Sequence, residues 1–201
     1  MQLNIKHITK DQLKPIKWSG GTSTELAIHP ENASYQDRQF NWRLSTATVE
    51  VEESNFTSLP GVQRLIMSLS GDLELKHKDH HHIHLKPFQV DCFSGDWITQ
   101  SFGKVTDFNL MTQGDYKGVL KAISITKDHQ EYIHLSPHCT TALYPVESGI
   151  TSTIAHETYI LNKDELLIIE NDSEEDVSVL LENKINYQTH IIISTISISY
   201  P

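Results

Sequence analysis

Apolar and polar residues alternate in short runs along most of this chain, and the alternation predicts β-strands. No window holds an apolar stripe of helical spacing over three turns. The one helix signal, a capping-box pattern at residues 9–12, is limited to about one turn by Pro15. The strands expected in the first half cover residues 41–51, 63–70, 72–76, 82–85, 89–92, 97–102 and 106–112. Those expected in the second half cover residues 118–126, 131–135, 141–146, 151–155, 158–161, 166–170, 177–181 and 189–199. Short strands broken by Gly, Pro, Asn and Asp are typical of antiparallel barrels and sandwiches.

The order strand, acidic turn, strand occurs once in each half of the chain. Phe93-Ser94-Gly95-Asp96 precedes one such strand, and Leu161-Asn162-Lys163-Asp164 precedes the other. This internal echo predicts an all-β protein of two related barrels in tandem, formed by residues 1–115 and 116–201. Because no linker-like stretch separates the halves, we expect them to pack as one unit.

The net charge of the chain argues against some classes of binding partner. The 201 residues include 16 basic and 26 acidic side chains, which gives a net charge of −10. This excess of negative charge argues against binding to nucleic acid or to an anionic membrane surface. The chain shows neither a signal-peptide pattern nor an apolar run of spanning length, so we expect a cytoplasmic protein. Cys92 and Cys139 fit reduced thiols, and a disulfide between them stays open.

Arginine is scarce, and two of the three arginines lie in dense motifs. Arg43 follows Trp42, and Arg64 closes a stretch that begins at Phe56, whereas Arg38 lies in a polar segment. A lysine cannot replace the planar, five-donor guanidinium where a carboxylate is held at two points. Arg43 and Arg64 therefore either bind an anion or pair with an internal carboxylate as a structural clamp, and the spacing favours neither.

Two expected strands carry polar residues on one face. With a period of two, Arg43 and Ser45 share a face of the first strand, and Asp107 and Asn109 share a face of the other. Asp and Asn are poor strand formers, so their presence inside a strand indicates either a polar cavity or a solvent-exposed face.

A glycine pair marks a third polar cluster, Trp18-Ser19-Gly20-Gly21-Thr22. Paired glycines permit a sharp turn or the close approach of the backbone to a ligand. Trp18, Gly20, Gly21 and Thr22 are therefore candidates for the mouth of a binding site, and a tight loop that leads into the first strand is the alternative.

Five of the twelve histidines fall in residues 77–84. His82 and His84 would share a strand face, so a zinc or nickel site is conceivable. The segment nevertheless lies between two short strands and is typical of a solvated hairpin tip. We therefore expect no physiological metal and no cofactor.

Five segments in order resemble the motifs of the HutD/Ves family. They are Trp18-Ser19-Gly20-Gly21-Thr22-Ser23-Thr24-Glu25, Trp42-Arg43-Leu44-Ser45-Thr46-Ala47, Phe56-Thr57-Ser58-Leu59-Pro60-Gly61-Val62-Gln63-Arg64, Phe93-Ser94-Gly95-Asp96 and Asp107-Phe108-Asn109-Leu110-Met111. The resemblance implies a bicupin, two tandem cupin-like antiparallel barrels, in a family linked to histidine utilisation in bacteria. It further implies that the protein senses or buffers a pathway metabolite such as formylglutamate. Ser19, Thr57 and Leu59 depart from the family pattern, where Asn, Ser and Phe are usual.

We accordingly expect a binding protein for a small anionic metabolite, without turnover. Arg43 would hold a carboxylate at two points, and Arg64 would hold a second carboxylate or orient Asp107. Ser45 and Asn109 would hydrogen-bond neutral amide or formyl atoms. The rivals are a metal-independent isomerase or hydrolase that uses Asp107 as base, and a regulatory protein that binds another protein. A homodimer through the barrel edges is a further expectation.

Overall fold

The computed structural model describes residues 3–199 and consists almost entirely of β-strands, so the predicted all-β class is confirmed. Contacts divide the chain into two compact units. The N-terminal unit is Leu13–Leu120, and the C-terminal unit joins the residues up to Gln12 with Lys121–Ile198. Within the described residues, no helix is long and apolar enough to cross a membrane.

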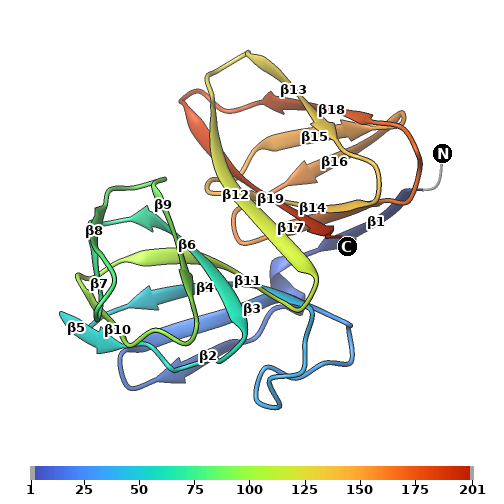
Figure 1. The fold of residues 1–201 in the computed structure, drawn as a ribbon. Coiled ribbons are helices and arrows are strands. Elements are labelled where there is room, and N and C mark those ends of the chain that lie inside the picture. The colour runs from blue at the N-terminus through green and yellow to red at the C-terminus, as the bar shows by residue number, and fades with distance from the viewer. Residues whose placement is uncertain (1–2, 200–201) are drawn as a thin grey trace. The chain divides into compact units, whose positions relative to one another are not determined.

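The N-terminal unit consists of two antiparallel sheets (Figure 1). The six-stranded sheet has the order β2 (Pro15–Trp18), β3 (Gly21–His29), β4 (Trp42–Val49), β11 (Thr106–Gln113), β6 (Val62–Ser70) and β9 (Val90–Ser94). The four-stranded sheet has the order β5 (Glu53–Asn55), β10 (Thr99–Phe102), β7 (Leu73–His77) and β8 (His82–Leu85).

An apolar cluster fills part of the N-terminal unit. Its buried members come from both sheets and the adjoining loop, and they are Ile66, Leu73, Leu75, Leu85, Phe93 and Val105. Alternation along the strands explains the cluster, because Leu73 and Leu75 are buried whereas Glu74 and Lys76, between and after them, are not.

The C-terminal unit repeats the two-sheet plan. Its five-stranded sheet has the order β1 (Leu3–Ile8), β17 (Leu166–Asn171), β14 (Cys139–Pro145), β19 (Thr189–Ile198) and β12 (Tyr116–Ile125). Its four-stranded sheet has the order β13 (Gln130–Leu135), β18 (Val177–Asn183), β15 (Ile150–Ile154) and β16 (Glu157–Leu161). In both units the two sheets are separate ladders over the described residues, so the expected barrels are not closed.

The two units do not coincide with the expected halves, 1–115 and 116–201, because the first strand belongs to the C-terminal unit. β1 pairs antiparallel with β17, from Leu3 opposite Asn171 to Ile8 opposite Leu166. The N-terminal residues therefore complete the sheet of the C-terminal unit. Residues 1 and 201, the expected outer limits, lie outside the described part of the chain.

The expected strands all occur, with ends shifted by a few residues, and β1, β2, β3 and β5 were not expected. β3 was missed because its first half is polar, and its pairing with β4 supplies the order that its own composition does not indicate. The capping-box pattern forms one 3-10 turn, Lys10–Gln12, in which the Thr9 backbone N–H donates to Gln12 Oε1 over 2.8 Å.

Candidate functional site

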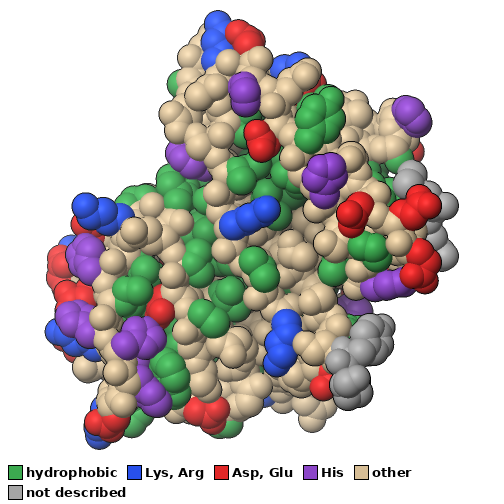
Figure 2. Space-filling view, turned by 45° about the horizontal axis from the view of Figure 1, so that its top comes forward, with side chains coloured by type: hydrophobic (Ala, Val, Ile, Leu, Met, Phe, Trp, Pro, Cys, Tyr) green, Lys and Arg blue, Asp and Glu red, His purple; other side chains and the backbone are tan. Residues whose placement is uncertain are grey.

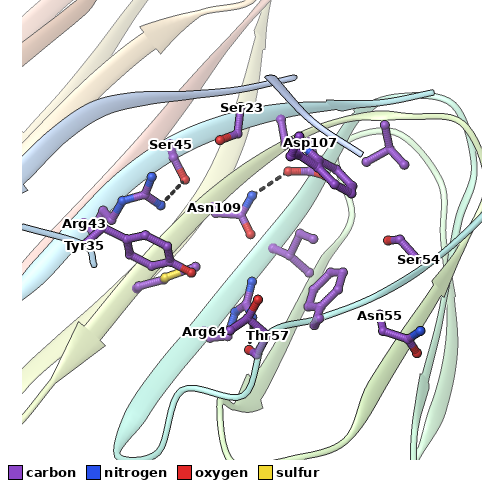
Figure 3. A pocket seen from close by; sticks show the side chains of 16 residues that line it. Ser23, Tyr35, Arg43, Ser45, Ser54, Asn55, Thr57, Arg64, Asp107 and Asn109 are labelled. Carbon is purple, nitrogen blue, oxygen red and sulfur yellow. Dashed lines mark hydrogen bonds between the residues drawn. The ribbon is translucent and has the colours of Figure 1, made fainter. Parts of the chain in front are cut away.

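A cavity of about 210 Å³ lies in the N-terminal unit, between the six-stranded sheet and β5 with the residues that follow it. The sheet contributes Arg43, Ser45, Arg64, Asp107 and Asn109 to its lining (Figure 3). Pockets for drug-sized ligands span roughly 300–1,000 Å³, so this volume suits a smaller metabolite.

The register of three adjacent strands, β4, β11 and β6, places these side chains opposite or near one another. β11 lies between β4 and β6, and Met111 is opposite both Arg43 and Arg64. Two residues back along β11, Asn109 is opposite both Ser45 and Ile66. Because side chains two residues apart share a face, the register gathers the polar groups on the inner side of one sheet. The polar faces of the two strands therefore lie together around one hollow.

Arg43 is buried, and carboxylate and hydroxyl partners already hold it. Its Nε donates to Glu25 Oε2 over 2.7 Å, and its Nη1 donates to Ser45 Oγ over 2.8 Å. The guanidinium also lies over the ring of Tyr35, 4.3 Å from its centroid. The structural-clamp alternative thus holds for much of Arg43, whose Nε and Nη1 already have internal partners.

Arg64 is equally buried, at 8% exposure, and its guanidinium lies over the rings of Phe56 and Phe93, 4.6 Å and 5.4 Å from their centroids, but it has few hydrogen-bond partners. Its Nη1 lies 3.5 Å from the backbone oxygen of Thr57, and its Nε has no hydrogen-bond partner. Among the described residues, no carboxylate lies within ion-pair distance of it. Burial lowers the pKa of Arg64 to about 10, against the opposing effects of Tyr35 and Asp107. The side chain is therefore a buried cation at neutral pH, and such a group is costly without a partner.

Asp107 is a carboxyl group with a strongly perturbed pKa. Burial raises the pKa of Asp107 to about 7, although the Asn109 hydrogen bond, the charge of Arg64 and the Ala47 backbone each lower it. Asn109 Nδ2 donates to Asp107 Oδ1 over 2.5 Å, so these two neighbours on β11 hold each other in place (Figure 3). Near neutral pH the group exchanges a proton readily.

The glycine-pair cluster divides between the cavity and the scaffold. Trp18 lines the cavity, whereas Gly20, Gly21 and Thr22 are not among its lining residues. A Cβ on Gly20 would meet the Trp18 ring at 2.1 Å, and one on Gly21 would meet the Thr48 backbone oxygen at 2.0 Å. The glycines therefore let the chain turn tightly and pack against β4.

The sequence did not assign Glu25 or Tyr35 to the site, although Glu25 pairs with Arg43 and Tyr35 lines the cavity. Glu25 lies on β3, opposite Ser45, at the start of a β-bulge. Glu25 is not itself a lining residue, but it lies two residues after Ser23, which is, and this period-two spacing is a signal that the expected loop concealed. Tyr35 comes from a segment without strand periodicity, and nothing in the sequence places it over Arg43.

Comparison with known proteins identifies the family. The HutD family model matches residues 10–187. The chain belongs to the HutD family.

Solved structures agree with this membership at the level of fold. HutD from Pseudomonas fluorescens is 20% identical, with a TM-score of 0.73 over 98% of this chain and 100% of that one. A conserved protein of unknown function from Pseudomonas aeruginosa is 19% identical, with a TM-score of 0.82 over 96% of this chain and 99% of that one. A mutant of Bacillus subtilis oxalate decarboxylase, 6% identical, has a TM-score of 0.71 over 97% and 78% of the two chains.

Two motifs of this HutD-family chain, residues 56–64 and 93–96, are joined by backbone hydrogen bonds. The Leu59 N–H donates to the Gly95 oxygen over 2.8 Å, and the Gly95 N–H donates to the Val62 oxygen over 2.7 Å. A Cβ on Gly95 would lie 2.3 Å from the Leu59 oxygen, so only glycine permits this contact. The pairing fixes the start of β6, and with it the position of Arg64.

The histidine tract is only partly the solvated hairpin tip that was expected. His82 and His84 are exposed on β8, where their Nε2 atoms contact Glu74 and Asp72. His77, in contrast, is buried at the end of β7 between Thr99 and Asp91. Its burial follows from the alternation of β7, on which Leu73, Leu75 and His77 share the inner face.

Proposed function

We propose that this HutD-family protein binds a small carboxylate metabolite in the cavity of the N-terminal unit and returns it unchanged. Arg64 carries the proposal, because it is a buried guanidinium whose Nε lacks a partner. A ligand carboxylate would supply that partner. A charged hydrogen bond of this kind contributes about 1.5–3 kcal/mol.

The charges around the cavity support an anionic ligand. Glu25 balances Arg43, and Asp107 is about half protonated near pH 7. Arg64 therefore leaves an excess of positive charge in a small space that the chain as a whole, at −10, does not have. An anion is attracted to this local potential in preference to the general surface.

The arrangement of groups suggests a role for each. Arg64 would hold one carboxylate, and the exposed part of the Arg43 fork would hold a second. Ser45, Asn109 and the protonated form of Asp107 would contact amide or formyl atoms, and Trp18 would border the opening. A metabolite of histidine degradation such as formylglutamate has these groups. A cytoplasmic location and a homodimer stay predictions.

Calorimetry tests the proposal directly. Formylglutamate and glutarate should bind with micromolar affinity, and the neutral diamide of glutarate should bind at least about tenfold more weakly. Arg64→Lys should weaken carboxylate binding by about tenfold, because an ammonium cannot replace the fork. Arg38→Lys, the same change at an exposed arginine, should have no effect. Equal affinities for the diacid and the diamide would contradict the proposal.

One observation favours a second candidate, an enzyme that uses Asp107 as general base. A carboxyl group with a pKa of about 7 is poised to exchange a proton at neutral pH. Incubation of the same metabolites with the protein, followed by NMR, separates the candidates. New product signals that Asp107→Asn abolishes would establish the enzyme, and unchanged metabolite spectra would support the binder.

A further inference from the structure

A second cluster of chemically active side chains lies outside the cavity lining. His77, His81 and Asp91 bring one nitrogen or oxygen each to within 4.8 Å of one another. They form the one group of three such residues, over the described part of the chain, with metal-ligand spacing. None of the three lines the cavity of Arg43 and Arg64.

Three segments of the N-terminal unit meet at this cluster. His77 ends β7, His81 lies in the hairpin that leads to β8, and Asp91 lies on β9 of the other sheet. The His77 N–H donates to the His81 backbone oxygen over 2.9 Å, so the hairpin returns His81 to His77. Figure 2 shows histidine side chains gathered on the left of the view, on the side where Figure 1 labels β7 and β8.

Hydrogen bonds already direct the Nε2 atoms of both histidines toward the Asp91 carboxylate. His77 Nε2 lies 2.8 Å from Asp91 Oδ2, and His81 Nε2 lies 3.0 Å from Asp91 Oδ1. Ligand atoms of a tetrahedral zinc ion are about 3.3 Å apart, because each bond is near 2.0–2.1 Å. The three ligand atoms lie within 4.8 Å of one another, so modest side-chain movements would bring them to this spacing around one ion.

The surroundings hold His77 in the orientation that a ligand needs. Its Nδ1 lies 2.8 Å from Thr99 Oγ1, and its ring packs on Phe93 with centroids 4.5 Å apart. When Nε2 binds a metal ion, the imidazole proton sits on Nδ1, where Thr99 Oγ1 accepts it. Such a partner behind a metal-bound histidine fixes its ring and tautomer.

We propose that His77 Nε2, His81 Nε2 and the Asp91 carboxylate bind one zinc ion or a similar divalent transition-metal ion. Two imidazoles and a carboxylate suit such ions, whereas Mg²⁺ and Ca²⁺ prefer all-oxygen sites. Three protein ligands leave at least one coordination position to water. The His81 side chain is 37% exposed and borders an open depression, so the ion has a route from solvent.

Calorimetry with zinc chloride, on protein free of any histidine tag, tests this site. One zinc ion should bind per chain, with no heat from Mg²⁺ at the same concentration. His81→Ala and Asp91→Asn should each lower zinc affinity by at least about tenfold, and Thr99→Val should lower it about tenfold through His77. His81 is part-exposed, so its variant should fold even if variants of buried His77 do not.

The double variant His82→Ala, His84→Ala is the matched control. It removes two histidines from the same hairpin but leaves the cluster intact, because their Nε2 atoms contact Glu74 and Asp72 instead. Unchanged zinc affinity in this control, with loss in His81→Ala, supports the site. Equal loss in both variants, no loss in His81→Ala, or several weak sites per chain would mean an adventitious ion only and would overturn the proposal.

Discussion

The two units share a two-sheet plan but differ in what the sheets enclose. In the C-terminal unit the buried cluster between the sheets is all Ile, Leu and Val. Its buried amides, Asn171 and Asn183, donate to backbone oxygens of neighbouring segments and so serve the fold. In the N-terminal unit the inner face of the larger sheet carries Arg43, Arg64 and Asp107 around a cavity.

This difference shows that the scaffold itself does not require a polar interior. The same architecture is stable with an aliphatic filling, because burial of apolar surface stabilises it without charged groups. A buried guanidinium with few hydrogen-bond partners, such as Arg64, costs stability, and its presence in one unit alone supports the proposal of a ligand there. Four experiments test this difference between the two units.

The largest expected effect is on the stability of the C-terminal unit. Leu181 is fully buried in its aliphatic cluster, so Leu181→Ala should reduce the free energy of unfolding by about 2–5 kcal/mol. Leu180→Ala, the same change at the half-buried neighbour on β18, should cost clearly less. Urea denaturation measures both, and the carboxylate affinity of the folded fraction should not change. A loss of affinity in Leu181→Ala would place the ligand site elsewhere.

Arg64→Met should lower carboxylate affinity without lowering stability, which is the reverse of the effect expected for Leu181→Ala. Removal of the buried cation should leave the free energy of unfolding unchanged or raised, because the desolvation cost disappears. Carboxylate affinity should fall by about 1.5–3 kcal/mol, roughly tenfold to a hundredfold. Denaturation and calorimetry on the same preparation measure the two quantities. If stability falls as in Leu181→Ala while affinity persists, Arg64 is a structural residue.

Arg43→Lys should weaken carboxylate binding about tenfold, or about 1.4 kcal/mol, and should leave the fold intact. The effect is expected to be smaller than for Arg64→Met because Glu25 and Ser45 already engage part of the fork. Calorimetry with a dicarboxylate measures it. Unchanged affinity would assign Arg43 to the scaffold alone.

The smallest expected effect is the pH dependence of binding. Asp107 carries its proton below its pKa of about 7 and is an anion above it. An ionised Asp107 repels a ligand carboxylate, so affinity should fall as the pH rises from 6 to 8, by about 0.5–1 kcal/mol with solvent screening. Asp107→Asn should abolish the dependence. A wild-type affinity that rises over this range would contradict the assigned repulsion.

The alternation of apolar and polar residues was sufficient to predict the all-β class and most of the strands. It also predicted that Arg43 and Ser45, and Asp107 and Asn109, share strand faces, because the side-chain period of a strand is a local property. The five ordered motifs identified the HutD family, whose membership is confirmed. These results needed only residues close together in the sequence.

Pairing between strands distant in the sequence determined the composition of the cavity, the place of β1 and the histidine cluster. Only the register of β4, β11 and β6 placed the two arginines on one face, and only β3 brought Glu25 to Arg43. The pairing of β1 with β17, and the meeting of His77 with Asp91 across two sheets, have no counterpart in local pattern. The physical reason is that strand partners lie far apart along the chain, so the contacts that set burial, charge pairing and pKa exist only after folding.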